Sequence, residues 1–215
     1  MLGSNLNKIK LGIINLKLNN LFSIYQACHN IGYKTEIIDH KVKKYNHDIL
    51  ILPGVGSFRV GMNNLIKQNW DKAIYNYVDR GRPLLGICLG MQLIFELGEE
   101  DGINKGLGLI KGKVSKIKIK NNEKLPHVGW NTLSFVKKHF VLRNLKEHVD
   151  YYFVHSYECI PDNKENLIAY SNYGGKLAAC VSNNKNVFGT QFHPEKSPPN
   201  GFIILKNFSE WDGKC

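Results

Sequence analysis

Short apolar runs alternate with amphipathic segments along the first half of the chain, and this alternation is the strongest constraint on the fold. The apolar runs are rich in Ile and Leu and end at polar residues, glycine or proline, which is typical of buried strands. Strands are predicted at residues 10–14, 35–38, 49–52 and 84–87, and helices at 20–31, before Leu65, at 71–78 and at 91–97. Such alternation predicts βαβ units, with helices on both faces of a parallel sheet.

The pattern changes after Gly106, where strand-like segments follow one another and favour antiparallel pairing. These segments are residues 114–119, 151–157, 177–181 and 187–191, and a helix at 202–211 closes the chain. The expected fold class is α/β, with an open, mostly parallel central sheet flanked by helices and an additional smaller antiparallel sheet. A single domain is expected at 9–208, after a disordered start or cloning remnant at 1–8 and before a tail at 209–215.

Composition argues against several classes of function. The net charge is +11, but the basic residues are scattered and are not interleaved with aromatic residues, so no nucleic-acid partner is expected. No apolar run approaches the roughly 20 residues that span a bilayer, so no membrane association is expected. The five cysteines lack C-x-x-C spacing, which argues against disulfides or a zinc site and predicts a reducing, cytoplasmic location.

Cys88 lies between two glycines, where a predicted strand ends and a predicted helix begins, in the segment Gly86-Ile87-Cys88-Leu89-Gly90. This is the cysteine form of the nucleophile elbow, in which glycines permit a sharp turn and close packing. The N-terminus of the following helix favours the thiolate, the nucleophilic form of cysteine. A buried cysteine beside a turn is the alternative interpretation, so the elbow alone does not identify a catalytic residue.

His193 and Glu195 follow another predicted strand, in the segment Gln191-Phe192-His193-Pro194-Glu195. Pro194 favours an extended conformation at His193, and residues two apart in an extended chain project to the same side. The carboxylate can then orient the imidazole, so the three residues Cys88, His193 and Glu195 match the logic of a nucleophilic triad. Other histidines lack such a partner, and surface positions are expected for His29, His40, His47 and His139.

The segment Pro53-Gly54-Val55-Gly56 ends a third predicted strand. Glycines at this point let backbone N–H groups approach a developing oxyanion, together with the N–H of Leu89 after the elbow. A Pro-Gly-x-Gly loop is more often only a turn, so this interpretation depends on the catalytic role of Cys88.

Several motifs, spread over about residues 9–208, carry a resemblance to a known family. The sequence resembles the class I glutamine amidotransferases, and within them it is most similar to the glutaminase subunit of imidazole glycerol phosphate synthase. The elbow and the His-Pro-Glu motif are shared by the whole class, whereas Pro-Gly-Val-Gly and His-x-Gly-Trp-Asn point to this branch. The resembling segments are 52–58, 86–92, 106–110, 126–131, 152–157 and 191–197.

The resemblance implies the fold of that family and the hydrolysis of L-glutamine to glutamate and ammonia, without a metal or cofactor. By the same resemblance, Cys88, His193 and Glu195 form the triad. Val55 and Gly56 match the oxyanion strand. In such a reaction the histidine serves first as acid and then as base.

The resemblance also implies where substrate and partner bind. Gln92 and Glu100 match positions that hold the glutamine. Asn20, Trp130 and Lys196 match positions at the interface with a synthase or cyclase subunit of the (β/α)₈ barrel type, the heterodimer partner that receives the ammonia. A core position for Trp130 and a solvated surface position for Lys196 are the alternative interpretations.

One segment departs from the family pattern. The family usually has Asp-Tyr-Gly-x-Gly-Asn after the first strand, whereas this chain has Asn15-Leu16-Lys17-Leu18-Asn19-Asn20 and keeps only the final Asn. This loop is expected near the partner face, so the change bears on the identity of the partner. Three hypotheses remain: a subunit for histidine biosynthesis, a paralogous glutaminase for an enzyme that amidinates or aminates a surface sugar, and a non-catalytic or redox-sensing protein on the same fold.

Overall fold

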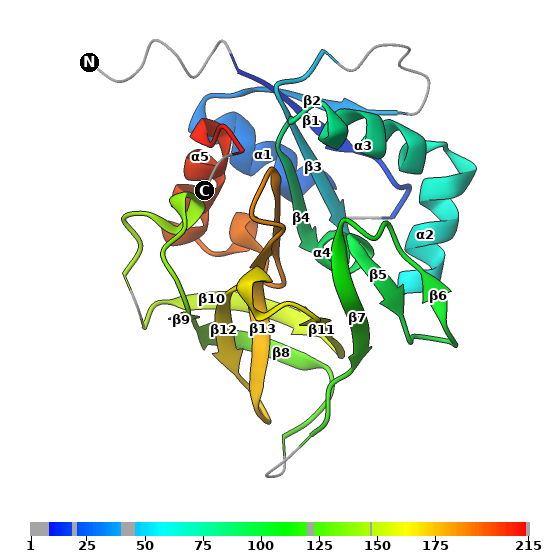
Figure 1. The fold of residues 1–215 in the computed structure, drawn as a ribbon. Helices are drawn as coiled ribbons and strands as arrows, with labels where there is room; N and C mark the ends of the chain where they lie inside the picture. Colours follow the sequence, from blue (N-terminus) through cyan, green and yellow to red (C-terminus); the bar gives the residue numbers. More distant parts are fainter. Residues whose placement is uncertain (1–8, 19–20, 40–45, 120–122, 147, 214–215) are drawn as a thin grey trace.

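A central sheet of eight strands organises the molecule, and its strand order is β2-β1-β3-β4-β14-β13-β12-β9 (Figure 1). The computed structural model describes residues 9–18, 21–39, 46–119, 123–146 and 148–213. The parallel strands are β1 (Lys10–Ile14), β2 (Lys34–Ile38), β3 (Ile49–Gly54), β4 (Leu84–Cys88) and β14 (Val187–Thr190). The antiparallel continuation consists of β13 (Lys176–Ser182), β12 (Leu167–Asn172) and β9 (Ser134–Phe135).

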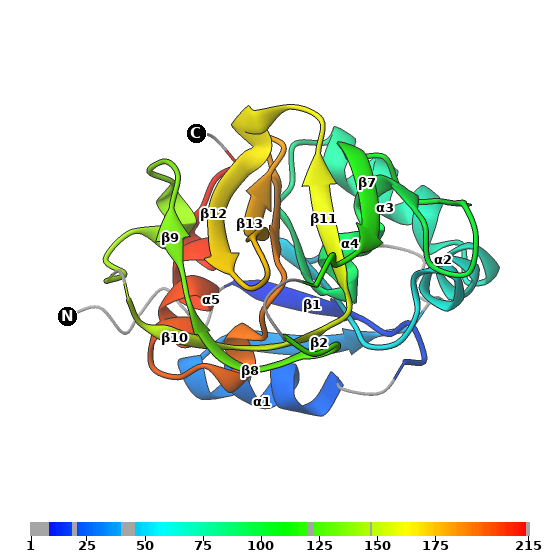
Figure 2. The same ribbon diagram turned by 90° about the horizontal axis from the view of Figure 1, so that it is seen from below.

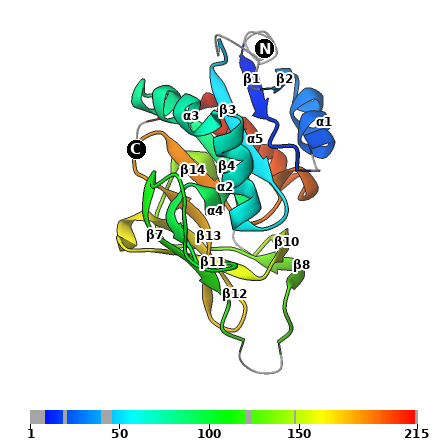
Figure 3. The same cartoon turned by 90° about the vertical axis from the view of Figure 1, so that its right-hand side faces the viewer.

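Helices cover both faces of the parallel half of the sheet, as Figure 3 shows. One face carries α1 (Leu21–Ile31) and α5 (Asn200–Glu210), which contact each other. The opposite face carries α2 (Phe58–Lys67) and α3 (Trp70–Asp79), with the short helix α4 (Leu89–Leu93) directly after β4. Both faces of the strands are therefore buried, which is why their sequences read as continuous apolar runs.

Two hydrophobic cores lie on the two sides of this sheet, and successive residues of each strand alternate between them. Ile13 and Ile51 pack into the core with α1 and α5. Ile14, Leu50 and Leu52 pack into the other core, against α2 and α3. This alternation is the geometric consequence of the strand pleat, in which successive side chains point to opposite faces.

Two smaller sheets lie beyond the carboxyl ends of β3 and β4 (Figures 1 and 2). One pairs β8 (His127–Thr132) with β10 (Asp150–His155) in antiparallel fashion. The other has the order β11-β7-β5-β6, and β5 pairs with β7 in parallel. Its strands are β5 (Phe95–Gly98), β6 (Asn104–Lys105), β7 (Ile110–Lys116) and β11 (Tyr157–Pro161). The small sheets thus face the carboxyl ends of the parallel strands, where α/β proteins bind ligands.

The predicted α/β fold class is confirmed, but one predicted element is wrong. The expected helix at 91–97 is in fact the end of α4 followed by strand β5, which pairs with β7. Leu93, Ile94 and Phe95 are all fully buried, so their apolar run has no polar face from which a period can be read. The strands β8 and β12 were not predicted: β8 pairs with the distant strand β10, whereas β12 forms a hairpin with β13, the next strand along the chain.

Ordered structure extends beyond residue 208, the predicted end of the domain. Helix α5 ends at Glu210, and Trp211 packs against Phe188 and Phe208 in the core. The predicted start at 1–8 lies outside the described residues. Within the described part of the chain, no helix has the length and apolar character needed to cross a membrane.

Candidate functional site

Cys88 occupies a strained turn between β4 and α4. Its backbone has φ 53° and ψ −110°, a conformation that costs free energy in a residue with a side chain. The two flanking glycines permit the turn by allowing close backbone contacts. A Cβ on Gly90 would lie 1.7 Å from the carbonyl oxygen of Leu52, and a Cβ on Gly86 would lie 2.7 Å from that of Gly90. The elbow therefore holds the thiol at the carboxyl end of the central sheet.

His193 and Glu195 form a buried pair just after β14. His193 is extended, with φ −97° and ψ 97°, and begins the short 3₁₀ helix Pro194–Lys196. Its Nδ1–H donates to Oε1 of Glu195 at 2.7 Å, and His193 is only 1% exposed. The hydrogen bond fixes the tautomer and the ring orientation, which leaves Nε2 as the nitrogen available to a nucleophile.

The charge state of His193 is set by its neighbours. Burial by itself lowers the pKa of His193, but hydrogen bonding and charge interactions with Cys88 and Glu195 outweigh burial and raise this pKa to about 10. Nε2 is buried, and among the described residues it has no hydrogen bond of normal geometry. An imidazolium at this position favours a thiolate nucleophile at Cys88.

The other described cysteines are buried thiols of a different kind. Burial, with a smaller effect of the Glu195 charge, raises the pKa of Cys28 to about 12. Burial also raises the pKa values of Cys159 and Cys180. A thiol that stays protonated is a poor nucleophile, so these three residues act as small apolar side chains.

A cavity of about 280 Å³ opens beside Cys88. Its walls bring together the expected oxyanion and substrate residues: Val55, Gly56, Leu89, Gln92 and Glu100. The rest of the lining comes from the small sheets and the loop before β8, namely Pro126, Val154, His155, Ser156 and Tyr157. The segment 154–157 was not assigned to the site from the sequence, although its strand-like pattern was recognised.

Gln92 and Glu100 hold defined positions in this cavity. The Nε2 group of Gln92 donates to the backbone carbonyl of Tyr157 at 3.3 Å and to Oε1 of Gln191 at 3.2 Å. Oε2 of Glu100 accepts the backbone N–H of Phe58, the first residue of α2, at 2.6 Å. Glu100 is therefore joined to the segment that directly follows Val55 and Gly56 in sequence.

Trp130 lies on the surface, not in the core. It is 57% exposed, and its ring contacts Tyr152 edge-on at 5.8 Å between centroids. Nζ of Lys196 lies 5.2 Å from the centre of the Tyr152 ring, within the range of a cation–π contact. Tyr152 in turn lies 6.3 Å from the ring of His193. Asn20, the third expected interface residue, lies outside the described residues.

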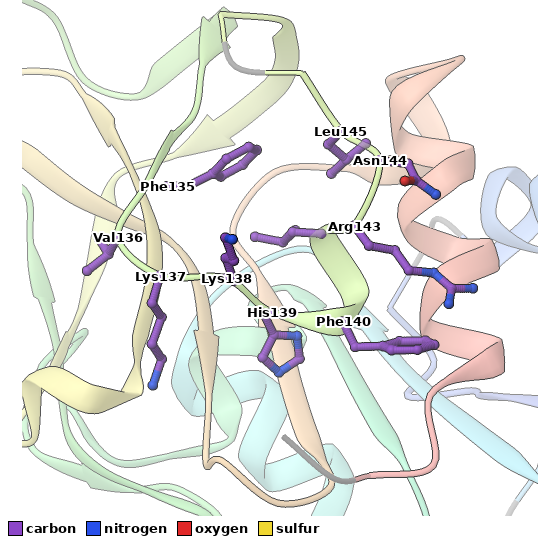
Figure 4. A pocket seen from close by; sticks show the side chains of 10 residues that line it. Phe135, Val136, Lys137, Lys138, His139, Phe140, Arg143, Asn144 and Leu145 are labelled. Carbon is purple, nitrogen blue, oxygen red and sulfur yellow. The ribbon is translucent and has the colours of Figure 1, made fainter.

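A larger cavity of about 820 Å³ lies elsewhere, along the segment 135–145 (Figure 4). Two of its polar side chains, those of Lys137 and Arg143, already bind within the chain. Lys137 donates to the carbonyl of Glu165 and to Oδ1 of Asn184, and Arg143 contacts Asn207 and Glu210. Because these groups are occupied, the smaller cavity at Cys88 is the better candidate for a catalytic site.

The expectation of surface positions for the other histidines is wrong for two of them. His47 is buried, and its Nε2 lies 3.0 Å from Oε2 of Glu36. His139 is buried between the rings of Phe188 and Trp211. Both lie in polar stretches, and the partners that bury them are distant in sequence. His29 is exposed as predicted, and His40 lies outside the described residues.

Comparison with known proteins identifies the family. Residues 13–210 match the family described as "Glutamine amidotransferase class-I". The chain belongs to the class-I glutamine amidotransferase family. As a member it is a glutamine amidotransferase, which confirms the resemblance seen in the sequence. In the described part of this amidotransferase, no group of three or more His, Cys, Asp or Glu side chains is arranged to hold a metal ion.

Relatives of this amidotransferase share nearly its whole length. It is 41% identical to the imidazole glycerol phosphate synthase subunit HisH of Desulfitobacterium hafniense, covering 94% of each chain. It is 46% identical to the protein of the same name in Lactococcus lactis, covering 94% of this chain and 98% of the relative. The solved structure of PurLQS from Thermotoga maritima matches with a TM-score of 0.72 at 18% identity, covering 94% and 98%, and so shares the fold.

The contribution of the His193–Glu195 pair to the free energy of unfolding is expected to depend on pH. We expect Glu195→Gln to lower the free energy of unfolding by about 3 kcal/mol at pH 6 and by clearly less at pH 10. The pKa of His193 is about 10 in the folded chain, above its ordinary value of 6.5. Its protonation therefore stabilises the fold fully below pH 6.5, and this contribution is lost as the pH rises through 10. Urea denaturation of both proteins at each pH measures the difference.

Glu210→Gln is the control for this measurement. Glu210 forms a partly exposed ion pair with Arg143, for which the expected loss is about 1 kcal/mol or less. A loss for Glu195→Gln that is the same at pH 6 and pH 10 would contradict the raised pKa of His193.

Proposed function

We propose that this chain is the glutaminase subunit of an imidazole glycerol phosphate synthase and acts in histidine biosynthesis. The observation that carries the proposal is the buried His193–Glu195 pair beside Cys88, at a cavity lined by the residues expected to bind glutamine. The proposal is further supported by 41–46% identity to relatives named as a subunit of that synthase.

The first half of the reaction forms a thioester. The thiolate of Cys88 attacks the side-chain amide carbon of glutamine, and the carbonyl electrons move to the oxygen to form an oxyanion. The imidazolium of His193 then gives its Nε2 proton to the leaving nitrogen, the C–N bond breaks, and ammonia departs. Glu195 holds the ring in place throughout and stabilises its positive charge.

The second half regenerates the enzyme. Neutral His193 removes a proton from water, and the resulting hydroxide attacks the thioester carbonyl. The C–S bond breaks, glutamate leaves, and the thiolate and imidazolium are restored as a pair. The balance is one glutamine and one water consumed for one glutamate and one ammonia.

The oxyanion is held by backbone N–H groups. Leu89, at the start of α4, lines the same cavity as Cys88, as do Val55 and Gly56, and their backbone N–H groups are the proposed donors. Gly56 has φ 106°, a conformation that favours glycine, so a side chain at this position would strain the segment. Loss of one such donor costs about 10²–10³ in rate, which makes the Val55–Gly56 backbone a natural control point.

The ammonia passes to a synthase partner of the (β/α)₈ barrel type in the cytoplasm. The exposed side chains of Trp130 and Lys196 both contact the half-buried Tyr152, which adjoins His193, and aromatic side chains are enriched at protein interfaces. Asn20 is proposed to belong to the same interface. Docking at this cluster would close the route by which ammonia escapes to solvent.

A second candidate is a paralogous glutaminase that serves a surface-sugar enzyme. It is favoured by the departure from the family pattern at 15–20. In the described part of that segment, Asn15 and Lys17 both bind Asp39, at 3.0 and 2.8 Å. The names of the relatives favour the histidine pathway.

Affinity purification of the tagged chain from its own cells tests the proposal. We expect a cyclase subunit to co-purify and the complex to release glutamate from glutamine, faster when the substrate of the cyclase is present. Recovery of a sugar-modifying ligase would support the second candidate instead. A complex that releases no glutamate would favour the non-catalytic alternative.

Two variants make the test specific. Trp130→Ala is expected to reduce recovery of the partner at least about tenfold, since aromatic residues at interface centres are common hot spots. Ile103→Ala is the matched control, because Ile103 is 81% exposed but lies in the turn before β6. Equal recovery with both variants would contradict an interface at Trp130.

A further inference from the structure

Gln191 is a buried side chain that the proposed mechanism does not use. It directly follows β14 and is 0% exposed. Its backbone N–H donates to the carbonyl of Ala179 at 2.9 Å, and the N–H of His193 donates to the carbonyl of Tyr152 at 2.9 Å. The backbone is thus held on both sides of Phe192. Residues two apart in an extended segment project to the same side, so Gln191 and His193 both reach Cys88.

The carboxamide of Gln191 connects the nucleophile to a residue of the cavity. Its Nε2 donates to Sγ of Cys88 at 3.9 Å, a long contact that suits sulfur. Its Oε1 accepts from Nε2 of Gln92 at 3.2 Å. Burying an amide costs free energy unless its polar atoms are bonded, and here both the N–H and the C=O ends are used.

The hydrogen bonds of the two amides fix their relative orientation, and a thiolate at Cys88 would reinforce it. A thiolate attracts the N–H end of Gln191 and repels its oxygen, so Oε1 must face Gln92. Gln92 then directs one N–H to Gln191 and the other to the carbonyl of Tyr157. Both donors of Gln92 are thus occupied, which leaves its carbonyl oxygen to accept from a ligand in the cavity.

We propose that Gln191 is a positioning residue for the glutaminase reaction. It orients the sulfur of Cys88 and fixes the amide of Gln92 so that Gln92 accepts a hydrogen bond from an N–H of the substrate. This inference rests on the proposed function and deepens it. The site thereby selects ligands with a nitrogen donor at this position, and a carboxylate in place of the carboxamide would meet the oxygen of Gln92.

Several other groups act on the same sulfur and must be separated from Gln191. One is His193, which follows β14, interacts with Cys88 and is hydrogen-bonded to Glu195. The buried thiol of Cys159 interacts with Cys88 from β11. Glu100 and His155 line the same cavity, and burial lowers the pKa of His155 to about 4, so His155 is neutral near pH 7. None of these groups is altered in the variants below.

Alkylation of Cys88 by iodoacetamide, followed by peptide mass spectrometry between pH 5 and 10, tests the role on the isolated chain. Gln191→Glu puts a carboxylate where the donor was. We expect it to move the midpoint of the alkylation profile upward by about one pH unit or more. Gln191→Met, which removes the donor without adding charge, should move the midpoint in the same direction by less.

Glutamate release by the complex with its partner provides the second measurement. Gln191→Met should raise KM about tenfold, because Gln92 is no longer held with its oxygen toward the substrate. Asn207→Leu is the matched control. It also removes a buried amide, one that donates to the carbonyls of Val141 and Arg143, and should destabilise the chain without moving the alkylation midpoint.

The outcomes separate the two proposals. Unchanged alkylation profiles in both Gln191 variants would overturn the positioning role, as would an equal shift in Asn207→Leu. A wild-type complex that releases no glutamate would overturn the proposed function, whatever the alkylation profiles of the variants.

Discussion

Cys88→Ser is expected to lower kcat/KM for glutamine hydrolysis by about 10⁴ or more. Serine matches cysteine in shape, so the elbow and the cavity should persist. Its hydroxyl, however, does not ionise beside His193, and the thiolate–imidazolium pair is lost. Glutamate release by the purified complex measures the effect, and circular dichroism confirms that the variant is folded.

Cys180→Ala is the control for this substitution. Cys180 is fully buried on β13, and burial raises its pKa, so it cannot serve as a thiolate nucleophile. Its replacement should cost about 1 kcal/mol of stability and leave kcat/KM within a few fold of wild type. Substantial glutaminase activity in Cys88→Ser would show that another residue is the nucleophile.

Gly90→Ala is expected to have the largest effect on stability, with a loss of about 4 kcal/mol or no folded protein at all. The added Cβ would lie 1.7 Å from the carbonyl oxygen of Leu52, so β3 and α4 would have to separate. Those two elements carry the oxyanion segment and the elbow, and neither can move alone. Urea denaturation followed by circular dichroism measures the change in the free energy of unfolding.

Gly175→Ala is the matched control. Gly175 has no heavy atom within 4 Å of the position of a Cβ, and its φ lies outside the left-handed region. We expect a change within about 0.5 kcal/mol. Similar stability of Gly90→Ala and Gly175→Ala would mean that the contact between Gly90 and Leu52 is not as close as described.

The parallel half of the fold could be predicted from the sequence because the residues that specify each strand and helix lie close together in the chain. Strands such as β1 and β3 are buried on both faces, and turn residues bound each apolar run. The candidate triad could be proposed from the sequence for the same reason. The glycines around Cys88 and the two-residue offset of His193 and Glu195 each encode geometry within a few positions.

The remaining features depend on contacts between distant segments. The helix predicted over strand β5 is wrong because an apolar, fully buried residue such as Phe95 fits either a helix or a strand. The pairing of β5 with β7, which is distant in sequence, makes this segment a strand. His47 and Gln191 carry no local signal, since Glu36 and Cys88 reach them only through the tertiary fold. The pairing of β8 with β10, whose residues Val154 and His155 line the cavity, is non-local in the same way.

The bond between Glu100 and the N–H of Phe58 joins a residue proposed to bind glutamine to the segment 55–57, which is proposed to hold the oxyanion. An ammonium group that reached this carboxylate would compete for the oxygen that tethers the beginning of α2. Ligand binding in the cavity and the conformation of residues 55–57 are therefore thermodynamically coupled. Whatever shifts that loop must change affinity for the ligand by the same factor by which the ligand shifts the loop.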